Sequence, residues 1–166
     1  ADSETALTLN TRCYEAAIES FGALVAAIGR GVLAPQRQDL GLRSYHGRDD
    51  RPRAAARLDF TEPAEAVVRL VRALDHGPYA NPLALPKLQV GGRFLVVGAA
   101  EGAAGAGSPG QVLSTDDAGL TVACATGAVV LRGLRTMEGV AVCPKTITTP
   151  GDVLPALAEA DGARID

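Results

Sequence analysis

Apolar residues recur at intervals of three and four in two separate stretches of the chain. The first stretch, from Thr5 to Ile28, is followed by Gly29 and Gly31, so it predicts an amphipathic helix that ends at the glycines. Its apolar stripe consists of Cys13, Tyr14, Ala17, Ile18, Phe21, Leu24, Val25 and Ile28. The helix either packs on the second helix or belongs to a larger domain whose first part is absent, because little else in the sequence would cover the stripe.

The second helical stretch lies between Thr61 and Gly77. Its apolar residues share one helical face, namely Ala64, Val67, Val68, Val71 and Leu74. Thr61 is a suitable N-cap, because its hydroxyl oxygen can accept a hydrogen bond from a free N–H of the first turn. Gly77 and Pro78 would end the helix.

Beyond Lys87 the pattern changes to short runs of β-type spacing. We expect strands over residues 93–99, 111–114, 120–125 and 128–135, with a tight turn at Gly91-Gly92 and another turn over 116–119. A flexible loop is expected over 101–110 and a short helix over 153–160. Short strands with turns about every 8–12 residues favour a small antiparallel barrel or sandwich. The fold class is therefore α+β.

Residues 31–56, between the two helices, mix arginine with aspartate and lack regular spacing. This pattern is typical of a solvated linker. Within it, Tyr45, His46 and Arg48 place an aromatic ring, an imidazole and a guanidinium group around the flexible Gly47. A surface loop is the simpler interpretation, and a contact with substrate or with another domain is the alternative.

The composition of the chain argues against several functional classes. The net charge of −3 argues against a general binder of nucleic acid or anionic membranes. No apolar run approaches the roughly 18–20 residues that a membrane span requires. Cys13, Cys124 and Cys143 are odd in number and far apart, so we interpret them as reduced, buried thiols of a cytoplasmic protein.

Catalytic chemistry is missing from the sequence. The two histidines, His46 and His76, lie in unrelated loops, and no paired-cysteine metal site, Walker loop or G-x-S-x-G motif occurs. A nucleophile, a base and an oxyanion donor cannot be assembled from these residues. We therefore expect no catalytic residue and no metal site in this chain.

Several motifs follow one another in a characteristic order. They are TALTL (5–9), Gln38-Asp39, Tyr45-His46-Gly47-Arg48, LDFTEPA (58–64), LVRAL (70–74), PGQV (109–112), GLTVA (119–123) and GAVVL (127–131). In this order they resemble the C-terminal portion of the methionyl-tRNA formyltransferase family. The resemblance covers most of the chain from Thr5 to about Gly139.

The resemblance implies a parent enzyme that moves a formyl group from 10-formyltetrahydrofolate to an amine. The catalytic Asn, His and Asp of the family, and the cofactor site, belong to a Rossmann-like N-terminal domain, which is the implied partner of this chain. The implied divisions are the last helix of that domain (1–32), a linker (33–57), a C-terminal subdomain with an OB-like β-barrel (58–140) and a tail or linker to a following domain (141–166).

Two departures from the family pattern matter. From Leu83 onward the chain carries six basic and eight acidic residues, a net charge of −2, which is poor for binding phosphates, so nucleic acid is not the expected partner. Second, the chain runs past the expected end of the barrel into a helical tail, as if another domain followed. Residues 77–88 also replace the usual Pro-Gly-Ala loop, and they include Tyr79 and Asn81 as further candidates for substrate or interdomain contact. These features resemble formylation domains of nonribosomal peptide synthetases, which act beside a carrier protein and an adenylation domain.

Two alternatives to an assembly-line formyltransferase remain. The parent could be a stand-alone transferase that formylates aminoacyl-tRNA or an amino sugar. The chain could instead be a non-catalytic binding or linker module with only an ancestral likeness to formyltransferases. The transferase interpretations require that the first helix is not sealed into one core with the strands.

Overall fold

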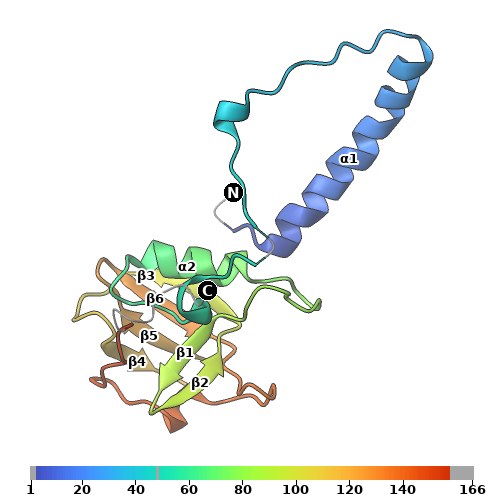
Figure 1. Cartoon of the computed structure of the whole chain (residues 1–166). Helices are drawn as coiled ribbons and strands as arrows, with labels where there is room; N and C mark the ends of the chain where they lie inside the picture. Colours follow the sequence, from blue (N-terminus) through green and yellow to red (C-terminus); the bar gives the residue numbers. More distant parts are fainter. Residues whose placement is uncertain (1–2, 48, 158–166) are drawn as a thin grey trace. The chain divides into compact units, whose positions relative to one another are not determined.

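The computed structural model describes residues 3–47 and 49–157. The chain divides into two compact units, Ala1–Asp50 and Arg51–Asp166 (Figure 1). The first unit contains the long helix α1, and the second contains helix α2 and the strands β1 to β6. The division falls inside the segment that the sequence identifies as a linker.

Helix α1 spans Ala6–Gly29, as the spacing predicts. At its C-terminus the N–H of Gly31 donates to the carbonyl of Ile28, and the N–H of Val32 donates to the carbonyl of Ala27. This Schellman arrangement requires a left-handed residue, and Gly31 supplies it with a φ of +67°. Farther along, the short 3₁₀ helix η1 (Leu40–Leu42) is capped by Asp39.

The second unit contains short antiparallel strands in two sheets. The strands are β1 (Lys87–Val90), β2 (Arg93–Val96), β3 (Ala99–Ala103), β4 (Val112–Thr115), β5 (Gly119–Ala123) and β6 (Ala128–Arg132). β1 pairs with β2, and the other strands have the order β3-β6-β5-β4. An isolated bridge joins Val96 of β2 to Arg135, three residues after the end of β6. The α+β class and the antiparallel pairing are confirmed.

Two of the predicted turns show why their residues are suited to them. Gly91 and Gly92 join β1 to β2 with φ angles of +53° and +78°, the backbone of a type I′ hairpin turn. Between β4 and β5, the Asp116 carboxylate accepts hydrogen bonds from the N–H groups of Ala118 and Gly119. These bonds hold the pKa of Asp116 below its ordinary value, because they stabilise the ionised form.

The core lies between helix α2 (Ala64–Ala73) and the four-stranded sheet. The helix packs on β3 and β6 (Figure 1). The five apolar residues predicted for its inner face are all buried. The largest fully buried side chains of the unit are Leu88, Leu120, Leu131, Val71, Val112, Val122 and Val129. The core is therefore mostly aliphatic, with Phe60 as its aromatic member among the buried residues.

Helix α2 begins later than the sequence predicts. Its N-cap is Pro63, so the assignment of Thr61 as the cap is wrong. The hydroxyl and the N–H of Thr61 both donate to the Asp59 carboxylate. The N–H of Ala64 donates to the carbonyl of Thr126, in the turn between β5 and β6, at 3.0 Å. An N–H of the first helical turn, which has no partner within the helix, thus forms its hydrogen bond with a residue distant in sequence.

The strand predicted over 93–99 and the loop predicted over 101–110 also need correction. The strand is interrupted after Val96, and β3 then continues through Ala103, because Glu101 and its neighbours pair with β6. Gly98 lies at the interruption, where a Cβ atom would come within 3.1 Å of the Gly133 carbonyl oxygen. This close approach of two backbones explains why a glycine occupies the position.

The C-terminal segment lacks the predicted helix over its described part, residues 153–157, and residues 158–160 lie outside the described residues. Val153 instead forms a β-bridge with Gln111, and the N–H of Leu154 donates to the Gly110 carbonyl at 2.9 Å. Leu154 is buried in the core. The segment is extended because its backbone pairs with the residues that lead into β4, and Pro155 has no N–H to continue a helix.

Gly110 and Gly91 offer a test of this C-terminal pairing. Both have positive φ, but a Cβ on Gly110 would lie 2.7 Å from the Leu154 carbonyl oxygen, whereas a Cβ on Gly91 would meet nothing within 4 Å. We expect Gly110→Ala to lower the free energy of unfolding by about 2 kcal/mol more than Gly91→Ala does. Urea denaturation measures both losses. Equal losses would contradict the pairing of Leu154 with Gly110.

Candidate interaction surface

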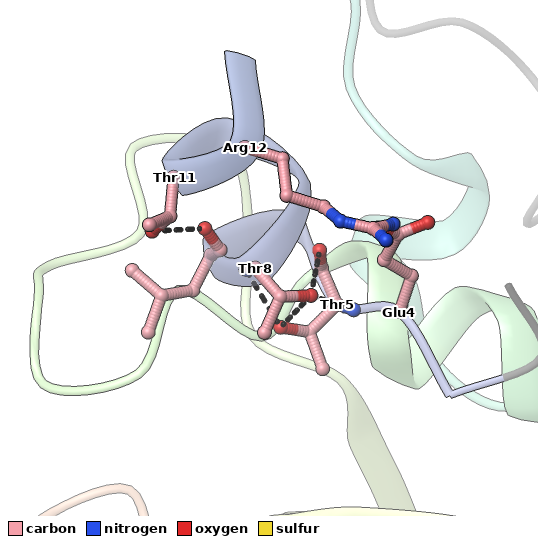
Figure 2. Close-up of polar contacts among 6 residues, drawn as sticks. Glu4, Thr5, Thr8, Thr11 and Arg12 are labelled. Atoms are coloured by element: carbon pink, nitrogen blue, oxygen red, sulfur yellow. Dashed lines mark hydrogen bonds and ion pairs between the residues drawn. The ribbon is translucent and has the colours of Figure 1, made fainter. Parts of the chain in front are cut away.

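Helix α1 starts with a set of polar contacts that involve only its own first turns. The Thr8 N–H donates to the Thr5 hydroxyl at 3.3 Å, and the Thr5 N–H donates to the Thr8 hydroxyl at 2.9 Å (Figure 2). This is a capping box with threonine in place of the usual glutamate. Glu4 forms an ion pair with Arg12, and the Thr11 hydroxyl donates back into the helix. These contacts fix where the helix begins but cover none of its apolar side chains.

The apolar stripe of α1 is exposed along its whole length. No residue of this helix is buried; Ile18 is 75% exposed and Phe21 is 63% exposed. We call the stripe the α1 apolar face, made of Cys13, Tyr14, Ala17, Ile18, Phe21, Leu24, Val25 and Ile28. Burial of one large apolar side chain contributes roughly 1.5–3 kcal/mol, and contiguous exposed apolar surface marks interaction sites. The α1 apolar face is therefore the main candidate site in the first unit.

The segment after α1 carries two of the residues that the sequence singles out. Tyr45 is 80% exposed, and His46 beside it is also exposed. The N–H of Gly47 donates to the Asp50 carboxylate at 2.7 Å, which forms a turn after the pair. Arg48 lies outside the described residues. The structure thus places Tyr45 and His46 in one surface loop and does not gather them around a cavity.

Tyr79 and Asn81 lie in the loop between α2 and β1. The side-chain amide of Asn81 donates to the Leu74 carbonyl at 2.7 Å, and its oxygen accepts from the Leu83 N–H at 2.8 Å. Both polar groups of Asn81 therefore stabilise the loop and cap the C-terminus of α2. Tyr79 is 69% exposed and is the member of this pair that a partner could contact directly.

A small cleft of about 220 Å³ lies beside the start of α2. Arg53 and Asp59 face each other across 3.9 Å at its edge. Arg57 donates to the side-chain oxygen of Gln89 at 2.7 Å and to the Ala156 carbonyl at 3.1 Å. The cleft is smaller than the roughly 300–1,000 Å³ of typical ligand pockets. Its charged side chains Arg53, Asp59 and Arg57 already have partners within the chain.

The backbone next to this cleft has an unusual conformation. Ala54, Ala55 and Ala56 have φ angles of +49°, +52° and +64°, and they are the non-glycine residues with positive φ in the described part of the chain. This left-handed conformation costs roughly 1–2 kcal/mol for each such residue. The Lys87 ammonium donates to the Ala55 carbonyl at 2.6 Å, and burial lowers the pKa of Lys87. Sequence reasoning misses this turn, because alanine ordinarily favours the right-handed helix.

The three cysteines are free thiols in different surroundings. Cys124 is buried in the core, and its burial raises the pKa of the thiol to about 11. Cys143 is half-buried, and Cys13 is exposed on the α1 apolar face. The expectation of buried thiols is thus correct for Cys124 and wrong for Cys13, because nothing in this structure covers that side of α1.

Other classes of site find no support in the described residues. Within residues 3–47 and 49–157, no group of three His, Cys, Asp or Glu side chains could hold a metal ion. No helix in that part of the chain is both long and apolar enough to cross a membrane.

The family of the chain is decided by a match to a family model. The model described as "Formyl transferase, C-terminal domain" matches residues 52–148, which is more than half of the chain. The chain belongs to this family. The matched region includes α2 and every strand from β1 to β6, so the second unit is the formyl transferase C-terminal domain.

Similar proteins extend the match toward the N-terminus. The methionyl-tRNA formyltransferase of Stutzerimonas stutzeri is 33% identical over 139 residues, covering 84% of this chain and 42% of that relative. The methionyl-tRNA formyltransferase of Thiobacillus denitrificans is 37% identical over 139 residues, covering 81% of this chain and 41% of that relative. The chain thus spans about two fifths of the length of the curated relatives it matches.

One solved structure shows a weaker likeness. A crystal structure of a HypX variant from Aquifex aeolicus matches with a TM-score of 0.49 and 22% identity, covering 72% of this chain and 20% of that chain. A likeness at this level carries no conclusion about function.

The pKa of Cys124 predicts an alkaline loss of stability. The thiol ionises near its ordinary pKa of 9.0 in the unfolded chain and near 11 in the folded chain, so its contribution is fully present below about 9 and is lost as pH rises through about 11. We expect Cys124→Ala to remove this part of the pH dependence, and Cys143→Ala to keep it. Urea denaturation at pH 8 to 11 is the measurement. Parallel pH profiles for wild type and Cys124→Ala would refute the assignment.

Proposed function

We propose that this chain is the non-catalytic C-terminal part of a formyltransferase that uses 10-formyltetrahydrofolate. We further propose that its acceptor is an aminoacyl group on the carrier protein of a nonribosomal peptide synthetase. Membership of the formyl transferase C-terminal domain family supports the reaction class. The two-fifths coverage of the relatives supports the view that the catalytic Asn, His and Asp of the family lie in a domain preceding this chain.

The exposure of the α1 apolar face is the observation that carries this proposal. A 24-residue helix with no buried residue has no tertiary cover, although most helical stability in proteins comes from such cover. The match to the relative from Stutzerimonas stutzeri covers 84% of this chain, which is more than the C-terminal domain at residues 52–148 alone. An N-terminal formyltransferase domain that packs on the α1 apolar face would bury these exposed apolar side chains.

We assign 10-formyltetrahydrofolate to that N-terminal domain and not to the second unit. The cleft of about 220 Å³ beside α2 is small for a folate, and Arg57 and Asp59 at its edge already have partners within the chain. The second unit would then position the acceptor or pack on a neighbouring domain. Tyr45, His46 and Tyr79 are the exposed residues that we propose for such contacts. The free thiols fit a reducing, cytoplasmic setting.

The balance of charge favours a carrier protein over tRNA as the acceptor. Binding to a nucleic acid depends on neutralising phosphates with Lys and Arg. The sequence from Leu83 onward instead has a net charge of −2. Aminoacyl-tRNA remains a second candidate, because the relatives at 33% and 37% identity are named methionyl-tRNA formyltransferase.

Thiol labelling tests the cover over α1. We expect a maleimide reagent to modify Cys13 readily in the 166-residue chain, and at least tenfold more slowly in the longer protein that contains the preceding domain. Cys124 is an internal control, because it is buried in the second unit itself and should react slowly in both proteins. Equal labelling of Cys13 in the two proteins would show that the preceding domain does not cover the α1 apolar face.

An activity assay tests the reaction and its acceptor. We expect the longer protein, supplied with 10-formyltetrahydrofolate, to formylate a carrier-bound aminoacyl group at least tenfold faster than aminoacyl-tRNA or a free amine. The 166-residue chain alone should show no turnover. A preference for aminoacyl-tRNA that falls steeply with salt would instead establish the second candidate. Turnover by the 166-residue chain alone would contradict the placement of the catalytic groups.

A further inference from the structure

The left-handed turn at Ala54–Ala56 lies at a distinctive place in the chain. It is the first turn of the second unit, shortly after the division between Asp50 and Arg51. Glycine would adopt the same backbone without a steric cost, yet all three residues are alanine. A strained turn of this kind persists only when its surroundings enforce it.

Most of the restraints on the turn come from strand β1, in addition to the Arg53–Asp59 ion pair and the hydrogen bond from Arg57 to the Ala156 carbonyl. The Lys87 ammonium donates to the Ala55 carbonyl at 2.6 Å, and the Leu58 N–H donates to the Lys87 carbonyl at 2.8 Å. Arg57 forms a parallel β-bridge with Lys87 and also donates to the side chain of Gln89. Both sides of the turn are therefore held by β1, one by a side chain and the other by backbone pairing.

These restraints differ in how easily they can be released. Ala56, Leu58 and Phe60 are buried in the core, so the end of the turn and the residues after it are held as firmly as the rest of the unit. Ala55 is exposed, and its restraint is one hydrogen bond from a long, flexible lysine side chain. The part of the turn at Ala54 and Ala55 can consequently lose its lysine contact while the buried Ala56 keeps its place in the core.

We propose that residues 53–57 form a strained joint, which Lys87 holds closed and which opens locally while α2 and the sheets stay folded. In the open form Ala54 and Ala55 return to right-handed or extended conformations, which L-residues prefer, and the buried Ala56 stays in place. The connecting segment then leaves the second unit in a new direction. The joint would let the connecting segment change direction while α2 and the sheets keep their structure. This proposal does not depend on which acceptor the parent enzyme uses.

Hydrogen exchange in the 166-residue chain tests the role of Lys87. The reporter is the Arg57 amide, which donates to the Ala54 carbonyl at 3.1 Å and closes the turn. We expect Lys87→Met to speed its exchange at least tenfold and to speed tryptic cleavage after Arg53 by a similar factor. The core amides of Leu120 and Val129 should stay within twofold of wild type. Lys145→Met, which removes a lysine bound to Asp117 elsewhere in the unit, is the matched control and should leave the Arg57 amide unchanged.

Glycine substitution tests the strain itself. Ala55→Gly relieves the steric cost of the left-handed backbone and should slow exchange of the Arg57 amide by about fivefold. In that background, Lys87→Met should have an effect of less than threefold, because the turn no longer needs the lysine to stay closed. Ala118→Gly is the matched control, since Ala118 is exposed in a turn but has no positive φ, and it should speed local exchange.

Three results would overturn the proposal. The first is exchange of the Arg57 amide in Lys87→Met within twofold of wild type. The second is an equal acceleration of the Arg57, Leu120 and Val129 amides, which would mean that Lys87 stabilises the whole unit and not a local joint. The third is faster exchange in Ala55→Gly, which would mean that the turn holds no strain in solution.

Discussion

The burial of apolar helix surface is the constraint on which this structure depends. Helix α2 meets it within the chain, because its five apolar residues pack on the sheet and its first N–H bonds to the turn between β5 and β6. Helix α1 has a stripe of the same kind and a well-formed cap at each end, but none of its residues is buried. A surface of this kind needs a partner. The function proposed for the chain follows from that difference between the two helices.

Patterns among neighbouring residues were sufficient to predict the elements that contacts between neighbouring residues determine. The three-and-four spacing located both helices and the buried face of α2, and Gly91-Gly92 and Asp116 located two hairpin turns. Errors arose where a distant residue supplies a partner. Thr126 binds the N-terminus of α2, and Gly110 pairs with Leu154 where a helix was expected. No sequence window contains both members of such a pair, so no local pattern could reveal them.

The sequence was sufficient to predict an apolar interaction surface and the family, but not the roles of individual residues in the loops. The stripe from Cys13 to Ile28 and the motifs shared with formyltransferases identified a surface and a family from residues alone. Asn81 stays a predicted contact residue, and its amide also caps α2, a role that its distance of seven residues from Leu74 hides. The strained alanine turn had no signal at all, since three alanines ordinarily indicate a right-handed helix.

Hydrogen exchange along α1 tests the central claim most directly. In the 166-residue chain the amides of residues 10–28 should exchange rapidly, because a helix without tertiary cover opens easily. In the longer protein we expect the same amides to exchange at least 100-fold more slowly, as part of a cooperatively folded domain. Equal exchange rates in the two proteins would show that α1 has no partner there, and would contradict the assignment of this chain as the C-terminal part of a larger formyltransferase.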